Sequence, residues 1–306
     1  MNITAYLAAI GGVVLISFLW FGVSWNREGG KNAGILALLT GFLCVLLGLV
    51  CAKATYLLLR INTLSLDRLG EAILRIQPDE LSYYGGAAGI CLALWLSAKM
   101  LGESPRQVMN AFAPMGAFMA AGFRFAEGFL GMLGTGMYLE YSFFPVAVEI
   151  SWGDWKEYYL AVFMLEGIMS LIAMVLSLRH KGETYRFLRT LFYLCLPQIL
   201  CESLRSTSIA WLFVRAEMLF CYLLCEGVFV WYAFKADRKQ LKSWVPAIVG
   251  LVACGVVITA QFAIDGKIAI GNSAIPQWIC YAVEIAALAA MAVAEHKGYR
   301  AMNNEQ

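Results

Sequence analysis

Two short clusters of charged and polar residues stand inside long apolar stretches of the sequence. The first pairs Arg124 with Glu127, three residues apart, and the second is Gln198, Glu202 and Arg205, spaced four and three apart. In an α-helix these spacings place each cluster on one face. A guanidinium group suits a phosphate, because its planar fork of donors matches two phosphate oxygens. The clusters therefore indicate either a cavity for a charged group or salt bridges that hold helices together.

The apolar surroundings of these residues limit where they can lie. A charge at the middle of a bilayer costs at least about 2.5–3.5 kcal/mol, so such residues normally face a protein interior or a wet cavity and have partners. We therefore expect Arg124, Glu127, Glu202 and Arg205 to converge on one pocket near the outer leaflet. The ionisable residues inside the predicted helices include Arg124, Glu127, Glu166, Glu202, Arg205, Arg215, Glu217, Glu226 and Glu284.

Histidine and cysteine exclude several kinds of chemistry. The two histidines, His180 and His296, both fall in segments predicted to be cytoplasmic, so neither a Ser-His-Asp triad nor a histidine metal site can form on the outer side. The nine cysteines lie almost all within apolar stretches; Cys221 and Cys225 share a helix face, but two thiols without further ligands make a poor metal site. We predict no metal and no cofactor, and the net charge of +2 suggests no nucleic-acid partner.

The composition predicts that the charged clusters are embedded in a membrane. Of the 306 residues, 61% are hydrophobic and 14% charged, with a mean hydropathy of +0.70, whereas soluble domains have about 45–50% apolar and about 25% charged residues. Runs such as 34–50 and 247–263 approach the roughly 20 apolar residues that a helix needs to cross a bilayer. A transmembrane barrel would show short segments of alternating polarity instead. The sequence therefore predicts an all-α polytopic membrane protein.

Windows of about 19 residues divide the chain into nine candidate transmembrane helices. The fourth of them is interrupted by Arg124 and Glu127. The predicted helices cover residues 4–24, 34–58, 85–102, 109–133, 158–178, 187–205, 210–234, 245–263 and 275–294.

The distribution of basic residues predicts the orientation of these helices. With the N-terminus outside, 14 of the 23 basic residues are cytoplasmic, and the outer segment 134–157 has four acidic residues against Lys156 alone. The other outer segment, 59–84, carries three arginines and departs from the rule. The N-terminus has no basic region typical of a signal peptide, so the first helix should be retained. The cytoplasmic segments are 25–33, 103–108 with the flanking Lys99, 179–189, 235–242 and 296–306.

Two segments of the sequence have a recognisable pattern: Cys51-Ala-Lys-Ala-Thr-Tyr-Leu-Leu and, further on, Leu81-Ser-Tyr-Tyr-Gly-Gly-Ala-Ala-Gly89. Both resemble motifs of the prolipoprotein diacylglyceryl transferase family. The first is similar to that family's Gly-Ala-Arg-x-x-Tyr helix end. The second is similar to Met/Leu-Ser-Phe-His-Gly-Gly-x-x-Gly at the start of the next helix, with Tyr84 in place of the histidine.

The resemblance continues in order along the chain over about residues 1–235. Ala113-Pro114 and Gly122-Phe-Arg124-Phe-Ala-Glu127-Gly128 are similar to the family's Ala-Pro and Gly-Arg-x-x-Asn-Phe-x-Asn-x-Glu motifs, although Glu127 replaces an asparagine and Met132 falls where the last glutamate is expected. Phe144-Pro145 and Met164-Leu-Glu166-Gly167 resemble its Phe-Pro and Leu-Leu-Glu-Gly. Gln198-Ile-Leu-Cys-Glu202-Ser-Leu-Arg205 resembles Arg-x-x-x-Glu-x-x-Arg, with Gln198 in place of the first arginine.

The resemblance implies a fold, an activity and a location. Residues 1–235 would form a seven-helix core, and residues 236–306 would add two transmembrane helices and a short cytoplasmic tail. Members of the family move the diacylglyceryl group of phosphatidylglycerol to the thiol of a lipobox cysteine in a lipoprotein precursor and release glycerol phosphate. They do so at the outer face of the bacterial plasma (inner) membrane, so phospholipid and lipoprotein precursor are the expected partners.

The resemblance also suggests roles for single residues. Arg124 would hold the departing phosphate, and Tyr84 and Glu202 would be catalytic, although a tyrosine with an unperturbed pKa near 10 is a poor base. Tyr84 has the alternative role of an aromatic anchor at the membrane interface, and a pair of glycines can simply let helices approach closely. The candidate substrate-binding residues are Arg124, Glu127, Arg205, Gly85, Gly86 and Gln198.

Three hypotheses for the function remain. The first is an active transferase of lipid groups with a divergent site. The second is a catalytically silent relative that binds phospholipid or lipoprotein precursors. The third is a transporter or receptor of other ancestry; a transporter often has inverted repeats and broken helices in corresponding halves, and neither is evident here.

Overall fold

The computed structural model describes residues 2–61, 69–75, 77–143, 145–206, 210–211, 214–236, 241–270, 273–274 and 276–304. The chain divides into two compact units, residues 1–190 and residues 191–306, and each unit is described by itself. The predicted domains, residues 1–235 and 236–306, have another boundary, and that division stays a prediction.

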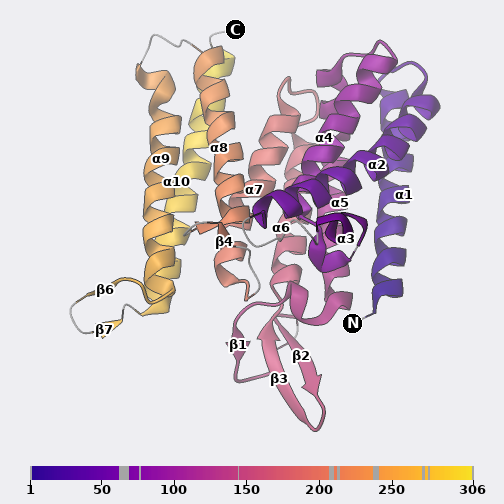
Figure 1. Ribbon diagram of the computed structural model, residues 1–306. Coiled ribbons are helices and arrows are strands. Elements are labelled where there is room, and N and C mark those ends of the chain that lie inside the picture. The colour runs from indigo at the N-terminus through magenta and orange to yellow at the C-terminus, as the bar shows by residue number, and fades with distance from the viewer. Residues whose placement is uncertain are drawn as a thin grey trace. The chain divides into compact units, whose positions relative to one another are not determined.

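The first unit is a bundle of helices with a small antiparallel sheet at one end (Figure 1). In the sheet the strand order is β1-β3-β2. Helix α7, Arg186–Leu204, begins in this unit and continues into the second. The other elements are α1 Ile3–Arg27, α2 Ala33–Leu59, α3 Leu69–Leu74, η2 Pro78–Glu80, α4 Tyr83–Met100, α5 Pro105–Glu127, η3 Gly128–Gly134, β1 Tyr138–Leu139, β2 Ala147–Trp152, β3 Trp155–Leu160 and α6 Val162–Arg179.

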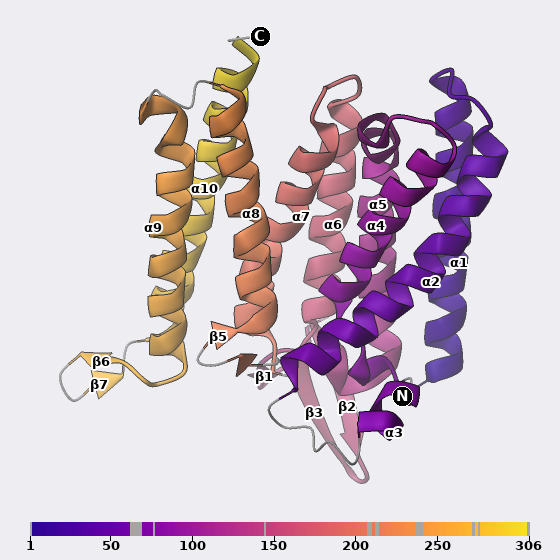
Figure 2. The same ribbon diagram turned by 45° about the horizontal axis from the view of Figure 1, so that its top comes forward.

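The second unit contains three long helices besides the main part of α7, and they run side by side in both ribbon views (Figure 2). Two short antiparallel strand pairs, β4 with β5 and β6 with β7, stand in the connections. The elements are β4 Ala210–Trp211, β5 Val214–Arg215, α8 Ala216–Lys235, α9 Leu241–Ile264, β6 Ala269–Ile270, β7 Ser273–Ala274 and α10 Gln277–Asn304.

The chain has the architecture of an all-α polytopic membrane protein, with short strands only in the described connections between helices. Seven helices of the described chain, α1, α2 and α6 to α10, are long and apolar enough to cross a bilayer. Many apolar side chains of these helices are exposed; Leu38 and Phe42 of α2, for example, are 78% and 68% exposed. Exposed apolar surface of this extent marks a surface that is covered, here by lipid. The prediction of a multi-pass membrane protein is therefore confirmed.

The predicted number of nine spans is not confirmed, because two of the nine helices do not belong to that apolar set. They are α4 and α5, which correspond to the predicted helices 85–102 and 109–133. Helix α5 carries polar residues along its length, among them Arg106 and Asn110, and most of it is buried against α1, α4 and α6. A helix enclosed by other helices needs less apolar surface than one that faces lipid.

The structure corrects four predicted helix boundaries. The predicted helix 158–178 begins only at Val162, because residues up to Leu160 pair as strand β3. The predicted helix 210–234 begins at Ala216, after β4 and β5. The predicted helix 275–294 runs over Gln277–Asn304 and takes in most of the predicted tail. Within 109–133 the α-helix ends at Glu127, and Gly131, with φ +71°, breaks the 3₁₀ turns that follow. Hydropathy windows detect apolar composition, which strands and turns beside a membrane share.

Small residues bring α2 and α4 close together. A Cβ atom at Gly85 would lie 2.7 Å from Cβ of Thr55, and one at Gly89 would lie 2.8 Å from Cα of Gly48. Both distances are shorter than carbon–carbon contacts of about 3.5–4.0 Å. Further along the same face, the hydroxyl of Thr40 donates to that of Ser97 at 2.8 Å. These glycines give the helix pair its close approach, as small residues commonly do in membranes.

The later part of the acidic segment 134–157, which is predicted to lie outside, belongs to the β2–β3 hairpin, at the end of the first unit where α1 begins (Figure 1). Its turn contains Gly153 with φ +65°, a conformation that favours glycine. On the exposed hairpin, the hydrogen bond and charge of Glu149, 2.8 Å away, raise the pKa of Lys156. The Tyr159 hydroxyl donates to Glu157 at 2.7 Å, which raises the pKa of Tyr159.

Candidate functional site

Arg124 is the centre of a buried polar cluster in the first unit, which we call the Arg124 cluster: Arg124, Glu127, Glu166 and Tyr83. Its Nη1 donates to Oε1 of Glu127 at 2.6 Å, and its Nε lies 3.1 Å from Oε2 of Glu166. The guanidinium carbon stands over the ring of Tyr83, 3.9 Å from the ring centre. Three helices therefore supply the cluster, α4, α5 and α6.

The packing of α5 against α6 explains why Arg124 and Glu166 meet. Arg124 is followed by Phe125, and Glu166 is followed by Gly167. The ring of Phe125 packs over Gly167, where a Cβ atom would lie 2.7 Å from Cζ of the ring. Tyr83 is the first residue of α4. The side chain of Ser82 accepts a hydrogen bond from the backbone N–H of Gly85 and so caps that helix at its N-terminus. The cap stabilises the first turn of α4, the turn that contains Tyr83.

The charge balance of the Arg124 cluster matters for its chemistry. Arg124 is buried, with 2% of its side chain exposed, and it faces two carboxylates, of which Glu166 is fully buried and Glu127 is 14% exposed. Removing an arginine from water is costly unless charges and hydrogen bonds compensate it, and the carboxylates do this. In the described part of the chain, Nη2 of Arg124 nevertheless has no hydrogen-bond acceptor. A buried donor without an acceptor costs about 1–3 kcal/mol, so an anionic oxygen at this position would be stabilised.

The predicted residues Tyr84, Gly85 and Gly86 lie in the first turn of α4, next to the Arg124 cluster. Tyr84 is buried, and its ring packs edge-on against that of Tyr83 with centroids 5.4 Å apart. Gly85 is needed for the contact with α2, whereas a Cβ at Gly86 would meet atoms only at 3.8 Å, an ordinary contact. The packing alternative therefore accounts for Gly85 but leaves Gly86 free for another role.

The second predicted cluster lies on α7 in the second unit. Gln198, Glu202 and Arg205 are all buried, and Nε of Arg205 lies 3.6 Å from Oε1 of Glu202. Arg215, just before α8, donates from Nη1 to the backbone carbonyls of Glu202 and Arg205, the latter at 2.9 Å. These carbonyls belong to the C-terminal end of α7, where the helix lacks its own donors and a cation is favourable.

The C-terminal helix adds a carboxylate beside this cluster. Glu284 of α10 is fully buried and accepts a hydrogen bond from Ser203, the neighbour of Glu202, at 3.1 Å. In the described part of the chain, the other oxygen of Glu284 and the hydroxyl of the buried Tyr222 have no hydrogen-bond partner. The segment after residue 235 thus takes part in the polar interior of the second unit.

The structure brings Arg124 together with Glu127, and Glu202 together with Arg205. Arg124 and Glu127 belong to the first unit, and Gln198, Glu202 and Arg205 belong to the second. The expectation that Arg124, Glu127, Glu202 and Arg205 share one pocket stays a prediction.

Sequence reasoning did not place Tyr83, Glu166, Arg215 or Glu284 in the site. Glu166, Arg215 and Glu284 are charged residues within apolar stretches, and this position is the signal that the sequence offers for them. Tyr83 carries no signal of its own, because the position of its ring over the guanidinium depends on the packing of α4 against α5.

No cluster suitable for a metal ion is found: among the described residues, no group of three or more His, Cys, Asp or Glu side chains could hold one. His180 follows α6, at the end of that helix away from Glu166, where it contacts Glu183 at 2.8 Å. The Arg124 cluster itself offers an arginine, two carboxylates and one tyrosine.

Together, the fold and these clusters define a class of protein: a multi-pass membrane protein with a buried arginine–carboxylate centre. The sequence matches no protein-family model, and comparison with characterised proteins gives no match.

Proposed function

We propose that this chain is a bacterial inner-membrane protein with nine transmembrane helices, its N-terminus outside and its C-terminus in the cytoplasm. It binds the phosphate of a phospholipid at Arg124 and transfers the diacylglyceryl group to an acceptor thiol at the outer face. The resemblance to the prolipoprotein diacylglyceryl transferase family supplies this activity. The observation that carries it is Nη2 of Arg124, a buried donor without an acceptor among the described residues.

The transfer can be written in terms of the Arg124 cluster. The acceptor thiol loses its proton, and the sulfur forms a bond to the terminal carbon of the diacylglyceryl group. The bond from that carbon to the phosphate oxygen breaks, and the electron pair leaves with glycerol phosphate. Arg124 stabilises the charge that develops on the phosphate. Glu127 is the more accessible of the two carboxylates to the thiol proton, because its side chain is 14% exposed and that of Glu166 is fully buried.

A second candidate, a relative that binds phospholipid without turnover, is favoured by the residue at position 84. Both candidates place the phosphate at Nη2 of Arg124, because Nε and Nη1 already face Glu166 and Glu127. Tyr84 stands where the family resemblance leads one to expect histidine, and a tyrosine is a weaker base at neutral pH.

The experiment that tests the proposal compares lipid binding and group transfer in the same preparations. The assay follows transfer from labelled phosphatidylglycerol to a lipobox peptide by purified protein in micelles. Arg124→Lys keeps the charge but loses the planar fork of donors. We expect it to slow transfer by about tenfold to a hundredfold, the value of one charge-assisted hydrogen bond. The matched control is Arg189→Lys, which alters another buried arginine, paired with Glu183 at 3.0 Å.

Tyr84→Phe separates the two candidates. In an active transferase the hydroxyl takes part in proton transfer, so the substitution slows transfer and leaves phospholipid binding almost unchanged. In a relative that only binds lipid, neither quantity changes. If the folded wild-type protein gives no turnover with this pair of substrates, the transferase proposal is wrong as stated. If turnover is unchanged in Arg124→Lys, the site has been assigned to the wrong residue.

A further inference from the structure

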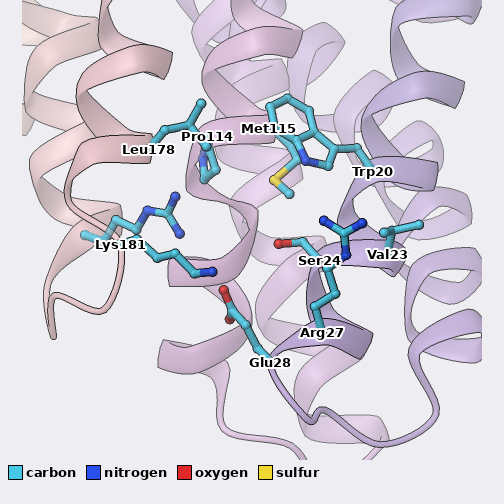
Figure 3. A pocket seen from close by; sticks show the side chains of 10 residues that line it. Trp20, Val23, Ser24, Arg27, Glu28, Pro114, Met115, Leu178 and Lys181 are labelled. Atoms are coloured by element: carbon cyan, nitrogen blue, oxygen red, sulfur yellow. The ribbon is translucent and has the colours of Figure 1, made fainter.

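The first unit contains a cavity at the end opposite to the Arg124 cluster, between α1, α5 and the turn after α6 (Figure 3). The backbone N–H of Asn2 donates to the carbonyl of Phe129 at 2.7 Å, so the start of α1 lies beside the end of α5 that holds Arg124. The cavity is lined by the last turns of α1, from Trp20 to Glu28, and therefore lies at the other end. Its volume is about 190 Å³.

The cavity has an apolar wall and a charged rim. Trp20, Met115 and Leu178 form part of the wall. The rim has three cations against a single carboxylate, and its residues stand at the ends of helices: Arg27 is the last residue of α1, Lys181 follows α6, and Arg186 is the first residue of α7. Helix ends of this kind lie where the hydrocarbon layer meets the head groups. The charged residues of the rim are Arg27, Glu28, Lys181 and Arg186.

Arg186 contacts a carbonyl of α5 that a proline leaves without its helical donor. Pro114 inside this helix has no backbone N–H, so the carbonyl of Asn110, four residues earlier, lacks its helical donor. Nη1 of Arg186 lies 3.5 Å from this carbonyl, and Nε donates to the carbonyl of Ser177 at 2.7 Å. The guanidinium group is buried and fixed by two helices. It is thus a preorganised cation at the rim of the cavity.

The other two cations of the rim are not engaged in the same way. In the described part of the chain, neither Arg27 nor Lys181 forms an ion pair within 4.0 Å. Figure 3 shows the end of the Lys181 side chain pointing toward Glu28, the one carboxylate of the rim. The formal charge of the rim is therefore +2.

A second cavity adjoins the first and extends the positive surface. It has a volume of about 580 Å³ and shares Glu28, Lys181 and Arg186 with the smaller one. Its additional cation, Arg106, stacks on the ring of Tyr185 at 4.3 Å. Its additional carboxylate, that of Glu183, is already neutralised by Arg189 at 3.0 Å. The volume lies in the range of about 300–1,000 Å³ that is usual for ligand sites.

The cavity also opens toward the surface that faces lipid. Val23 lines it and is 52% exposed, and the same helix presents exposed Leu15, Ile16 and Leu19 along its outer face. A ligand could therefore place an anionic group at the rim and apolar chains along α1.

From this geometry we infer that the cavity binds an anionic phospholipid of the leaflet at this end of the bundle, through its phosphate. Basic pockets between transmembrane helices recognise such head groups. Arg186, Lys181 and Arg27 hold the phosphate, and the wall around Trp20 and Met115 receives the glycerol and the first part of an acyl chain. The site is separate from the Arg124 cluster and does not depend on the function proposed for that cluster.

The test maps lipid contacts residue by residue. The full chain is placed in nanodiscs that contain phospholipids with a photoactivatable group near the carbonyl of one acyl chain, with either a phosphatidylglycerol or a phosphatidylcholine head group. Crosslinked peptides are quantified by mass spectrometry and normalised to labelling at Leu38, an exposed residue that contacts bulk lipid. We expect phosphatidylglycerol to label the peptides around Val23 and Leu178 several times more strongly than phosphatidylcholine does.

Charge variants and a blocking variant identify the site. Lys181→Gln should reduce the preference for phosphatidylglycerol about fivefold, which corresponds to one cation near a membrane surface. Lys99→Gln is the matched control, because Lys99 is an exposed lysine at the end of α4 and does not line either cavity. Ser24→Leu fills the cavity without changing its charge and should reduce labelling by both lipids at Leu178 but not at Leu38.

Three outcomes would overturn the inference. The first is equal labelling by the two head groups, which means annular lipid only. The second is an equal effect of Lys181→Gln and Lys99→Gln, which means general surface charge. The third is complete competition by soluble glycerol 3-phosphate, which means that the cavity binds a free phosphate ester and not a lipid. Because labelling is assigned to peptides, a failure at this cavity is distinguishable from a failure at Arg124.

Discussion

Gly86 and Gly89 of α4 offer a direct test of whether the glycines beside Tyr84 serve packing or binding. Gly89→Ala adds a methyl group that would overlap the carbonyl of Leu47 and lie 2.8 Å from Cα of Gly48. That distance is about 1 Å shorter than an ordinary carbon–carbon contact, and α2 can yield only by moving its backbone. We expect a loss of about 1–3 kcal/mol in the free energy of unfolding, the usual cost of overpacking.

Gly86→Ala is the matched control on the same helix. Its new Cβ would meet atoms only at 3.8 Å, against Ala52 and the carbonyl of Gly48. Replacing glycine by alanine within a helix stabilises it by up to about 1 kcal/mol. Two substitutions that each add one methyl group, three residues apart, should therefore change stability in opposite directions, with a difference of about 1–4 kcal/mol.

The assay is equilibrium unfolding of the purified protein with SDS in mixed micelles, followed by circular dichroism. Equal stability of the two variants would refute the close approach of α2 and α4 at Gly89. Lipid binding is measured on the same samples. If Gly86 contributes to substrate binding, as its motif suggests, Gly86→Ala weakens binding without loss of stability; unchanged binding would remove Gly86 from the site.

Three further predictions concern the topology and the buried polar contacts. Cysteines introduced at Asp154 and Arg300 should react with an impermeant reagent from opposite sides of the membrane, with wild-type protein as the blank; reaction from the same side would contradict the N-out, C-in orientation. Ser203→Ala removes the hydroxyl that donates to the buried carboxylate of Glu284 in α10 and should cost about 1–3 kcal/mol of unfolding free energy. The control is Thr259→Ala, whose hydroxyl donates to a carbonyl of its own helix, and it should cost less than about 0.5 kcal/mol. Equal costs would mean that the contact with α10 contributes little. Glu166→Ala leaves the buried Arg124 with one carboxylate and should lower the free energy of unfolding by about 3–5 kcal/mol. The measurement is the same SDS unfolding. A loss below about 1 kcal/mol would show that water reaches the pair of Arg124 and Glu166.

Local regularities of the sequence predicted what depends on local geometry. Long apolar runs predicted the membrane class and the approximate position of each long helix, because a backbone in lipid must satisfy its hydrogen bonds within the segment. The spacing of Arg124 and Glu127 predicted their contact, because residues three apart on a helix are neighbours whatever surrounds them. The same rule placed Arg205 beside Glu202.

Contacts between helices were decided by the tertiary structure alone. Which carboxylate meets Arg124 from another helix depends on how α5 and α6 are rotated and how closely they pack, and that is set by the fit of Phe125 over Gly167. The β2–β3 hairpin was hidden for a related reason, since apolar residues in its second strand resemble the start of a helix in a hydropathy window. Composition fixes how much apolar surface a segment has, but the direction in which each side chain points is fixed only when the helices pack against one another.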